Sequence, residues 1–287
     1  MNMKTLLGII LFGMTIGCGY AQTEPSHEWK VTLKVVDDTG QPVAGAEVLV
    51  NYLSTHFSGI TDTNGVFTAS HVDQSVQLAF QVQKLGYYSY QTQYLLGFKY
   101  DTEKWHPTVT TILKRVSKPI AMYAKQNLQM VFPEYNKAIG YDLEIGDWVA
   151  PYGKGINADL FFTEAHPSPQ SGYIISVSFP NIGDGIQEFT VPDAEKGSAL
   201  RSEQKAPADG YQSTASQTET TNPKRNFYFR VHTKLDENGN VVSARYGKIY
   251  GDLAQFTYYY NPTPNDRSIE FDPKQSLLHS RFKVYAP

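Results

Sequence analysis

The stretch that decides the fold is Val31–Val50, which reads VTLKVVDDTGQPVAGAEVLV. Apolar and polar residues alternate over Val31–Val36, which is typical of a β-strand with one buried face. The turn formers Asp, Gly and Pro gather in residues 37–42, where Asp bonds its own backbone, Gly accepts a positive φ and Pro cannot extend a strand ladder. The alternation resumes over Ala46–Val50. The stretch therefore predicts two strands joined by a turn.

The same pattern continues to about Leu96. The run Asp62-Thr63-Asn64-Gly65 contains an Asn-Gly pair, which tolerates positive φ and predicts a β-hairpin. A further apolar stripe follows at alternate positions of residues 76–82. Short strands separated by turns at this spacing favour a β-sandwich over a helical or α/β fold.

Three motifs in this region carry a resemblance to a known family: Gly40–Ala46 (GQPVAGA), Thr61–Phe67 (TDTNGVF) and Lys84–Tyr88 (KLGYY). On these motifs, residues 28–115 resemble carboxypeptidase regulatory-like domains, which are transthyretin-like, immunoglobulin-like sandwiches. The resemblance implies an accessory module without an active site. The zinc peptidase that names the family needs a His-x-x-Glu pair, and none of the seven histidines has Glu three residues later. That activity therefore does not carry over.

Composition and the first residues limit the class of protein. A chain of 287 residues has room for two domains with packed cores, and its formal net charge of −3 argues against a nucleic-acid partner. Residues 1–21 contain the apolar segment Leu6–Phe12 followed by small residues, which indicates a signal peptide cleaved near Ala21 and too short to span a membrane. Cys18, the only cysteine, would carry a lipid anchor in an alternative interpretation. We expect a secreted or periplasmic bacterial protein without a transmembrane segment.

Residues 120–287 are expected to form a second, larger β-rich sandwich-type domain, and they resemble no family of known activity. Strands are predicted at Ala158–Thr163, Gly172–Phe179 and Gln187–Val191, where β-branched and aromatic residues recur. Residues 193–225 contain almost no large apolar side chain, so we expect a long polar loop there. The expected fold class is therefore all-β throughout.

Asp142 and Glu144 are the first candidates for catalysis. Residues two apart on a strand face the same side about 7 Å apart, and the carboxylate pairs of glycosidases are about 5 to 9.5 Å apart. Asp147 is a third acid close by in the sequence. The alternative interpretation is a solvated strand face with no chemistry.

Tyr141, Trp148 and Tyr152 surround these acids in the sequence and are the candidate ligand-binding residues. Their aromatic faces could stack on sugar rings. The alternative is that they are ordinary core aromatics.

Asp236, Asn238 and Asn240 are the candidate metal ligands. Oxygen-bearing side chains at alternate positions are typical of calcium loops, although the acidic residue that an EF-hand needs at its twelfth position is missing. The same residues also fit an Asn-Gly hairpin turn. Calcium is thus the alternative to the expectation of no cofactor.

The sequence contains no Gly-x-Ser-x-Gly, no His-Glu-x-x-His and no phosphate-binding loop. The leading hypothesis is therefore a non-catalytic binding protein with a protein or glycan partner. One alternative is a polysaccharide-active hydrolase that uses the acids at 142, 144 and 147. The other is a calcium-stabilised surface protein that uses the Asp236 loop.

Overall fold

The protein is described by a computed structural model in which residues 27–52, 55–73, 77–96, 105–127, 129–167, 172–218, 222, 224–278 and 284–287 have defined positions. The described chain is built from β-strands and one short 3-10 helix, which confirms the predicted all-β class. Within this part of the chain, no helix is long and apolar enough to cross a membrane. The predicted signal peptide of residues 1–21, its cleavage near Ala21 and the acceptor Cys18 lie outside the described residues.

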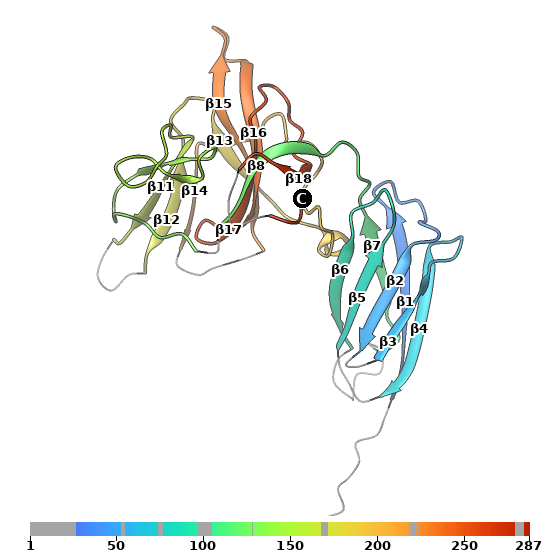
Figure 1. Ribbon diagram of the computed structural model, residues 1–287. Helices are drawn as coiled ribbons and strands as arrows, with labels where there is room; N and C mark the ends of the chain where they lie inside the picture. The colour runs from blue at the N-terminus through green and yellow to red at the C-terminus, as the bar shows by residue number, and fades with distance from the viewer. Residues whose placement is uncertain are drawn as a thin grey trace, which may run out of the picture.

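The first seven strands form a sandwich of two sheets, at the lower right of Figure 1. The strands are β1 (His27–Asp37), β2 (Glu47–Tyr52), β3 (Thr55–Ile60), β4 (Val66–Asp73), β5 (Gln77–Gln83), β6 (Tyr90–Leu95) and β7 (Thr108–Leu113). One sheet has the order β4-β1-β7 and the other β3-β2-β5-β6. The predicted alternation is confirmed, since Val31, Leu33 and Val35 are fully buried between the sheets. Each such side chain contributes about 1.5–3 kcal/mol on burial.

The turn at Asp62–Gly65 forms, but the predicted hairpin is wrong. Asp62 Oδ1 accepts the backbone N–H groups of Asn64 at 2.9 Å and Val66 at 2.8 Å, and Gly65 has a φ of +72°. However, β3 before the turn pairs with β2, and β4 after the turn pairs with β1 in the other sheet. The turn carries the chain from one sheet to the other. Local turn chemistry determines that the chain reverses direction, but it does not determine which sheet each flanking strand joins.

The remaining strands form a second sandwich, at the upper left of Figure 1, from a five-stranded sheet β10-β9-β11-β12-β14 and a six-stranded sheet β13-β15-β16-β17-β8-β18. Its elements are β8 (Ile120–Asn127), β9 (Ile139–Asp142), β10 (Asp147–Trp148), β11 (Leu160–Ala165), β12 (Ile174–Ser178), β13 (Gly185–Phe189), the 3-10 helix η2 (Asp193–Glu195), β14 (Thr214–Thr218), β15 (Asn226–Leu235), β16 (Val241–Gly251), β17 (Phe256–Asn261) and β18 (Phe271–Ser276). The strands predicted at 158–163, 172–179 and 187–191 are β11, β12 and β13; β12 lies within its predicted range, and the other two are shifted by about two residues. The second Asn-Gly turn does join a hairpin, β15 with β16.

The six-stranded sheet is buried on both faces. Part of the segment 193–225 helps to bury it, which corrects the expectation of a long polar loop there. One face packs against the five-stranded sheet, and the tyrosine-rich opposite face is covered partly by the segment 198–206. Leu200, Ser202 and Ala206 are buried there. Tyrosine hydroxyls satisfy the backbone of this segment, as Tyr250 Oη accepts the N–H of Ser202 at 3.1 Å. The segment is therefore held by small residues and distant tyrosines rather than by large apolar residues of its own, and it leads into strand β14.

The same segment also joins the two sandwiches. Gly197–Ala199 pairs with Ser89–Gln91 at the edge of the first sandwich: Gln91 N–H donates to Gly197 O at 2.7 Å, and Ala199 N–H donates to Ser89 O at 2.9 Å. A Cβ added at Gly197 would lie 2.5 Å from the carbonyl oxygen of Gln91, so the close approach requires glycine. Lys114, which follows β7, is buried and pairs with Glu195 at 2.6 Å. The junction is thus a bonded interface.

Candidate functional site

Asp142 has a structural role in the described geometry. Its buried carboxylate accepts four backbone N–H groups: Oδ1 from Glu144 and Ile145, and Oδ2 from Ile156 and Asn157, at 2.9 to 3.0 Å. Burial raises the pKa of this carboxyl, but the four hydrogen bonds outweigh burial and the pKa is lowered. The ionised group ties two loops together. It is unsuited to act as a general acid.

The three acids predicted for a hydrolase bind separate partners. Strand β9 ends at Asp142, so Glu144 lies in the following turn and not on the same strand face. Glu144 pairs with Arg245 at 3.2 Å, whereas Asp147 accepts the backbone N–H groups of Trp148 and Lys154. None of the three lines the surface depressions around Arg201, Tyr135, Lys84 or Gln81. The geometry therefore does not support the two facing carboxylates of a glycosidase.

Two of the three predicted binding aromatics are core residues. Tyr141 and Trp148 pack edge to face, with ring centroids 5.3 Å apart, in the core between the two sheets. Only Tyr152 is partly exposed, and its hydroxyl bonds with Glu134 and with Lys137 Nζ. Stacking on a sugar needs an accessible ring face, which the buried rings of Tyr141 and Trp148 do not offer.

The Asp236 loop is a turn in which the Asp236 carboxylate accepts three hydrogen bonds. Asp236 Oδ1 accepts the N–H groups of Asn238 at 2.9 Å and Asn240 at 2.8 Å, and Oδ2 accepts Asn240 Nδ2 at 2.9 Å. These bonds lower the pKa of the Asp236 carboxyl, the side-chain bond from Asn240 most of all. Asp236 thus accepts hydrogen bonds from both other candidate metal ligands. A calcium ion would have to replace these hydrogen bonds.

The structure also shows an Asp–His pair whose two residues lie far apart in the sequence and form no motif. His232 Nε2 bonds with Asp159 Oδ1, which lies 73 residues earlier, and Asp159 Oδ2 accepts the N–H of Leu143 at 2.6 Å. His232 has a φ of +56° where the pairing of β15 with β16 is irregular. The bond from Asp159 raises the pKa of His232 and outweighs the effect of burial. The pair holds this strained residue in place.

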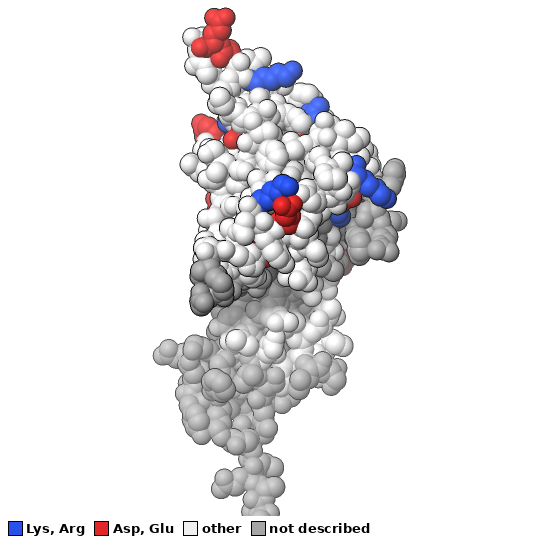
Figure 2. Space-filling model, turned by 90° about the vertical axis from the view of Figure 1, so that its left-hand side faces the viewer, with Lys and Arg blue, Asp and Glu red and all other residues white. Residues whose placement is uncertain are grey.

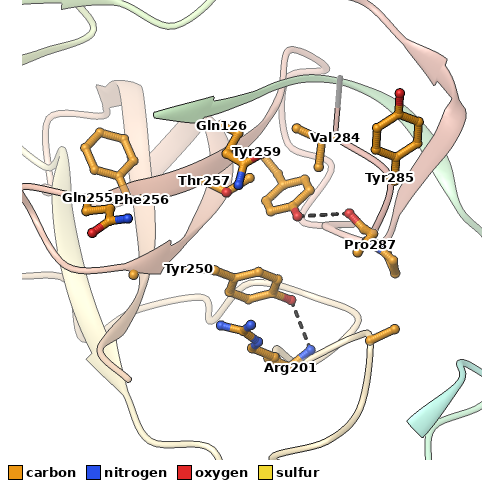
Figure 3. A pocket seen from close by; sticks show the side chains of 13 residues that line it. Gln126, Arg201, Tyr250, Gln255, Phe256, Thr257, Tyr259, Val284, Tyr285 and Pro287 are labelled. Atoms are coloured by element: carbon orange, nitrogen blue, oxygen red, sulfur yellow. Dashed lines mark hydrogen bonds between the residues drawn. The ribbon is translucent and has the colours of Figure 1, made fainter. Parts of the chain in front are cut away.

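A concave surface lies beside β16 and β17 (Figure 3). This Arg201 depression has a volume of about 430 Å³. The buried rings of Tyr250 and Tyr259 lie at its base, with their centroids 5.3 Å apart, and Arg201 lies over the Tyr250 ring at 5.3 Å. Tyr250 Oη accepts the backbone N–H of Arg201 at 3.2 Å, and Tyr259 Oη donates to Ala286 O at 2.9 Å. Both walls are thus fixed by tyrosine hydroxyls.

Polar side chains with open hydrogen-bonding capacity surround this base. Gln126, Gln255 and Arg201 are exposed, and within the described chain their side chains have no hydrogen-bond partner. Tyr285 is 82% exposed on the opposite wall. The depression therefore presents amide groups, one guanidinium and an accessible aromatic ring.

A second depression, the Tyr135 depression, adjoins the first and shares Gln255 with it. Its volume is about 550 Å³. Tyr135 is 58% exposed, and its ring lies 4.5 Å from that of His166, which in turn bonds with Glu164 at 2.8 Å. Gln129, Phe132 and Tyr173 also line it.

The side of the molecule that bears the five-stranded sheet faces the reader in Figure 2. Charged residues of both signs are scattered singly or in small groups over an otherwise uncharged surface. The described part of this face therefore presents neither a continuous basic patch nor a continuous acidic one.

No family model and no curated protein matches the chain. Among solved structures, the chain is similar to a 3-chlorocatechol 1,2-dioxygenase from Rhodococcus opacus (16% identity, TM-score 0.26, covering 33% of this chain and 62% of that chain). It is also similar to the shaft pilin SpaA from Lactobacillus rhamnosus (12%, 0.23, 56% and 90%). A third is a protein from Bacteroides uniformis whose name proposes carbohydrate binding (11%, 0.22, 83% and 98%). The chain spans less than two thirds of the dioxygenase. TM-scores this low assign neither a family nor a function.

Proposed function

We propose that this is a non-catalytic glycan-binding protein whose site comprises the Arg201 and Tyr135 depressions. The observation that carries the proposal is their shared residue Gln255, with amide and tyrosine side chains on both sides of it. Amides both donate and accept hydrogen bonds, as sugar hydroxyls do, and tyrosine offers a flat apolar face with a polar tip. An open, polar surface of this kind suits a hydrated polymer better than a small apolar ligand, which favours enclosed apolar cavities.

The carboxylates favour binding over hydrolysis. Glu164 is the one acidic residue among the described residues that line these two depressions, and it bonds with His166. Glycoside hydrolysis requires two carboxyl groups that act together on one bond. A lone acid engaged with a histidine supports recognition of a hydroxyl group.

The proposal includes the location and the role of the first sandwich. The apolar segment Leu6–Phe12 supports export to the periplasm or the cell exterior. The motifs at 40–46, 61–67 and 84–88 support an accessory module of the carboxypeptidase regulatory-like type. An exported protein with such an accessory module suits a polymer partner outside the cytoplasm.

The test is affinity electrophoresis of the mature protein through gels that contain different polysaccharides, with reducing ends assayed in the same slices. We expect retardation in at least one gel without released ends. Gln255→Ala and Arg201→Ala should each weaken retention about tenfold, the effect of losing one hydrogen bond. Gln212→Ala, an exposed glutamine outside both depressions, is the matched control.

Released reducing ends would replace this proposal with the hydrolase alternative. Migration unchanged in every gel would reject a glycan ligand and leave a protein partner as the function to test. Retardation that neither variant reduces would place the site elsewhere on the molecule.

A further inference from the structure

Two more depressions continue from the Arg201 and Tyr135 depressions onto the first sandwich. The Lys84 depression, of about 960 Å³, is lined by Lys84–Ser89 and also by Ala199 and Tyr285–Pro287. Because Ala199 and Tyr285–Pro287 also line the Arg201 depression, the two are direct neighbours across the junction. The Gln81 depression, of about 410 Å³, shares Glu47 and Gln83 with the Lys84 depression. Four depressions therefore follow one another from the second sandwich to the first.

Charged and amide side chains occur along the whole series, beside exposed apolar residues such as Leu85 and Ile60 on the first sandwich. The charged side chains of the series balance, since Arg201 and Lys84 are basic whereas Glu164 and Glu47 are acidic. Amides recur along its length, at Gln129, Gln255, Gln126, Gln83 and Gln81. A ligand with hydroxyl groups and no net charge complements such a surface, whereas a polyanion or a polycation meets charges of both signs.

The junction keeps the two halves of the series in one arrangement. Glu270 of the second sandwich accepts hydrogen bonds from Tyr88 Oη at 2.8 Å and from the N–H groups of Ser117 at 2.8 Å and Lys118 at 2.7 Å. Tyr88 itself lines the Lys84 depression. A preformed arrangement reduces the ordering cost that a long ligand must overcome on binding.

We infer that a single neutral polysaccharide chain binds along all four depressions and contacts both sandwiches. The inference rests on the proposed function. It adds that the first sandwich is part of the binding site and that the ligand is both long and uncharged.

The experiment is isothermal titration of the full mature chain with a length series of the neutral polysaccharide that the electrophoresis retains. We expect affinity to rise with chain length and then reach a plateau. Gln83→Ala should weaken binding of the long chains about tenfold and leave the shortest binding oligosaccharide unchanged. Gln41→Ala, an exposed glutamine of the same sandwich outside the depressions, is the matched control and should change neither.

The outcomes separate this inference from the proposed function. If Gln83→Ala has no effect and short and long chains bind equally, the two-sandwich site is rejected while glycan binding stands. Tighter binding of an acidic chain such as polygalacturonate would reject the neutral ligand. If no polysaccharide binds at any length, the proposed function and this inference fail together.

Discussion

Tyr88 donates its hydroxyl hydrogen to Glu270, 2.8 Å away and 182 residues later in the chain. The same carboxylate accepts the N–H groups of Ser117 and Lys118 in the connection between the sandwiches. Glu270 is buried, so its carboxylate depends on these three donors for its hydrogen bonds. This carboxylate is the centre of the interface that aligns the two halves of the proposed site.

Glu270→Gln should lower the free energy of unfolding by about 2 kcal/mol, because an amide cannot accept from three donors as a carboxylate does. Urea unfolding at neutral pH measures the change. Glu237→Gln, an exposed acid in the β15–β16 turn, should change it by less than about 0.5 kcal/mol. Equal effects of the two variants would show that the Glu270 contacts do not hold the junction.

Gly197→Ala should open the pairing between the 197–199 segment and the first sandwich. The added methyl group would lie 2.5 Å from the carbonyl oxygen of Gln91 and 2.7 Å from the Tyr90 ring. Amide hydrogen exchange should therefore become faster at Gln91 and Ala199, whose N–H groups donate across this interface. Lys196→Ala is the neighbouring control, and unchanged exchange in Gly197→Ala would argue against the close approach.

Asp142 should contribute to stability in a pH-dependent way. Its pKa in the folded protein is lowered, so its contribution is present above the ordinary Asp value of about 3.9 and is lost as the pH falls through the folded value. Asp142→Asn should reduce the free energy of unfolding by about 2 kcal/mol at pH 7 and flatten its decline in acid. Urea unfolding between pH 7 and pH 3 is the measurement. Parallel pH curves for the two proteins would contradict the four-bond geometry.

His232 should show the opposite pH dependence. Asp159 raises the pKa of His232 in the folded protein, so this contribution is complete below about 6.5, the ordinary His value, and is lost as the pH rises through the folded value. His232→Asn keeps a side chain that tolerates positive φ and should remove this part of the pH dependence. The exposed His56→Asn serves as control. A melting curve series from pH 5 to 9 that is the same for wild type and His232→Asn would reject the pair.

Chelation should leave the melting temperature unchanged, because the Asp236 carboxylate already accepts hydrogen bonds from its own turn. Asp236→Ala should destabilise the protein by about 1 kcal/mol through loss of these bonds. Thermal melts with EDTA, and with calcium added back, are the measurement. A drop with EDTA that calcium reverses would establish the metal-stabilised alternative.

Local patterns in the sequence predicted much of the fold. The alternation at Val31, Leu33 and Val35 gave a correct strand and a correct buried face, and Asp236–Asn240 gave a correct hairpin. The identical logic failed at Asp62–Gly65, because the sheets that the flanking strands join depend on packing far along the chain. The polar composition of residues 193–206 led to the wrong prediction of a loop, because the order of this segment depends on Tyr250 and other distant partners.

The candidate site was less predictable than the fold. The dense run of acids and aromatics at Tyr141–Gly155 suggested a site, yet much of its polar chemistry goes into holding its own loops. The depressions combine Gln126, Arg201, Gln255 and Tyr285, which are spread over most of the second sandwich. Single exposed glutamines and tyrosines carry no local motif, so only the fold brings them together.

Hydrogen exchange measured by mass spectrometry with the retained polysaccharide is the most direct test that a glycan binds at these depressions. We predict slower exchange on binding in residues 250–251, 255–257 and 284–287, which line the Arg201 depression, and in 83–89 when the chain is long. The β15–β16 turn at 236–240 should exchange unchanged. Protection confined to that turn, or to the face formed by β11, β12 and β14, would contradict glycan binding at the depressions.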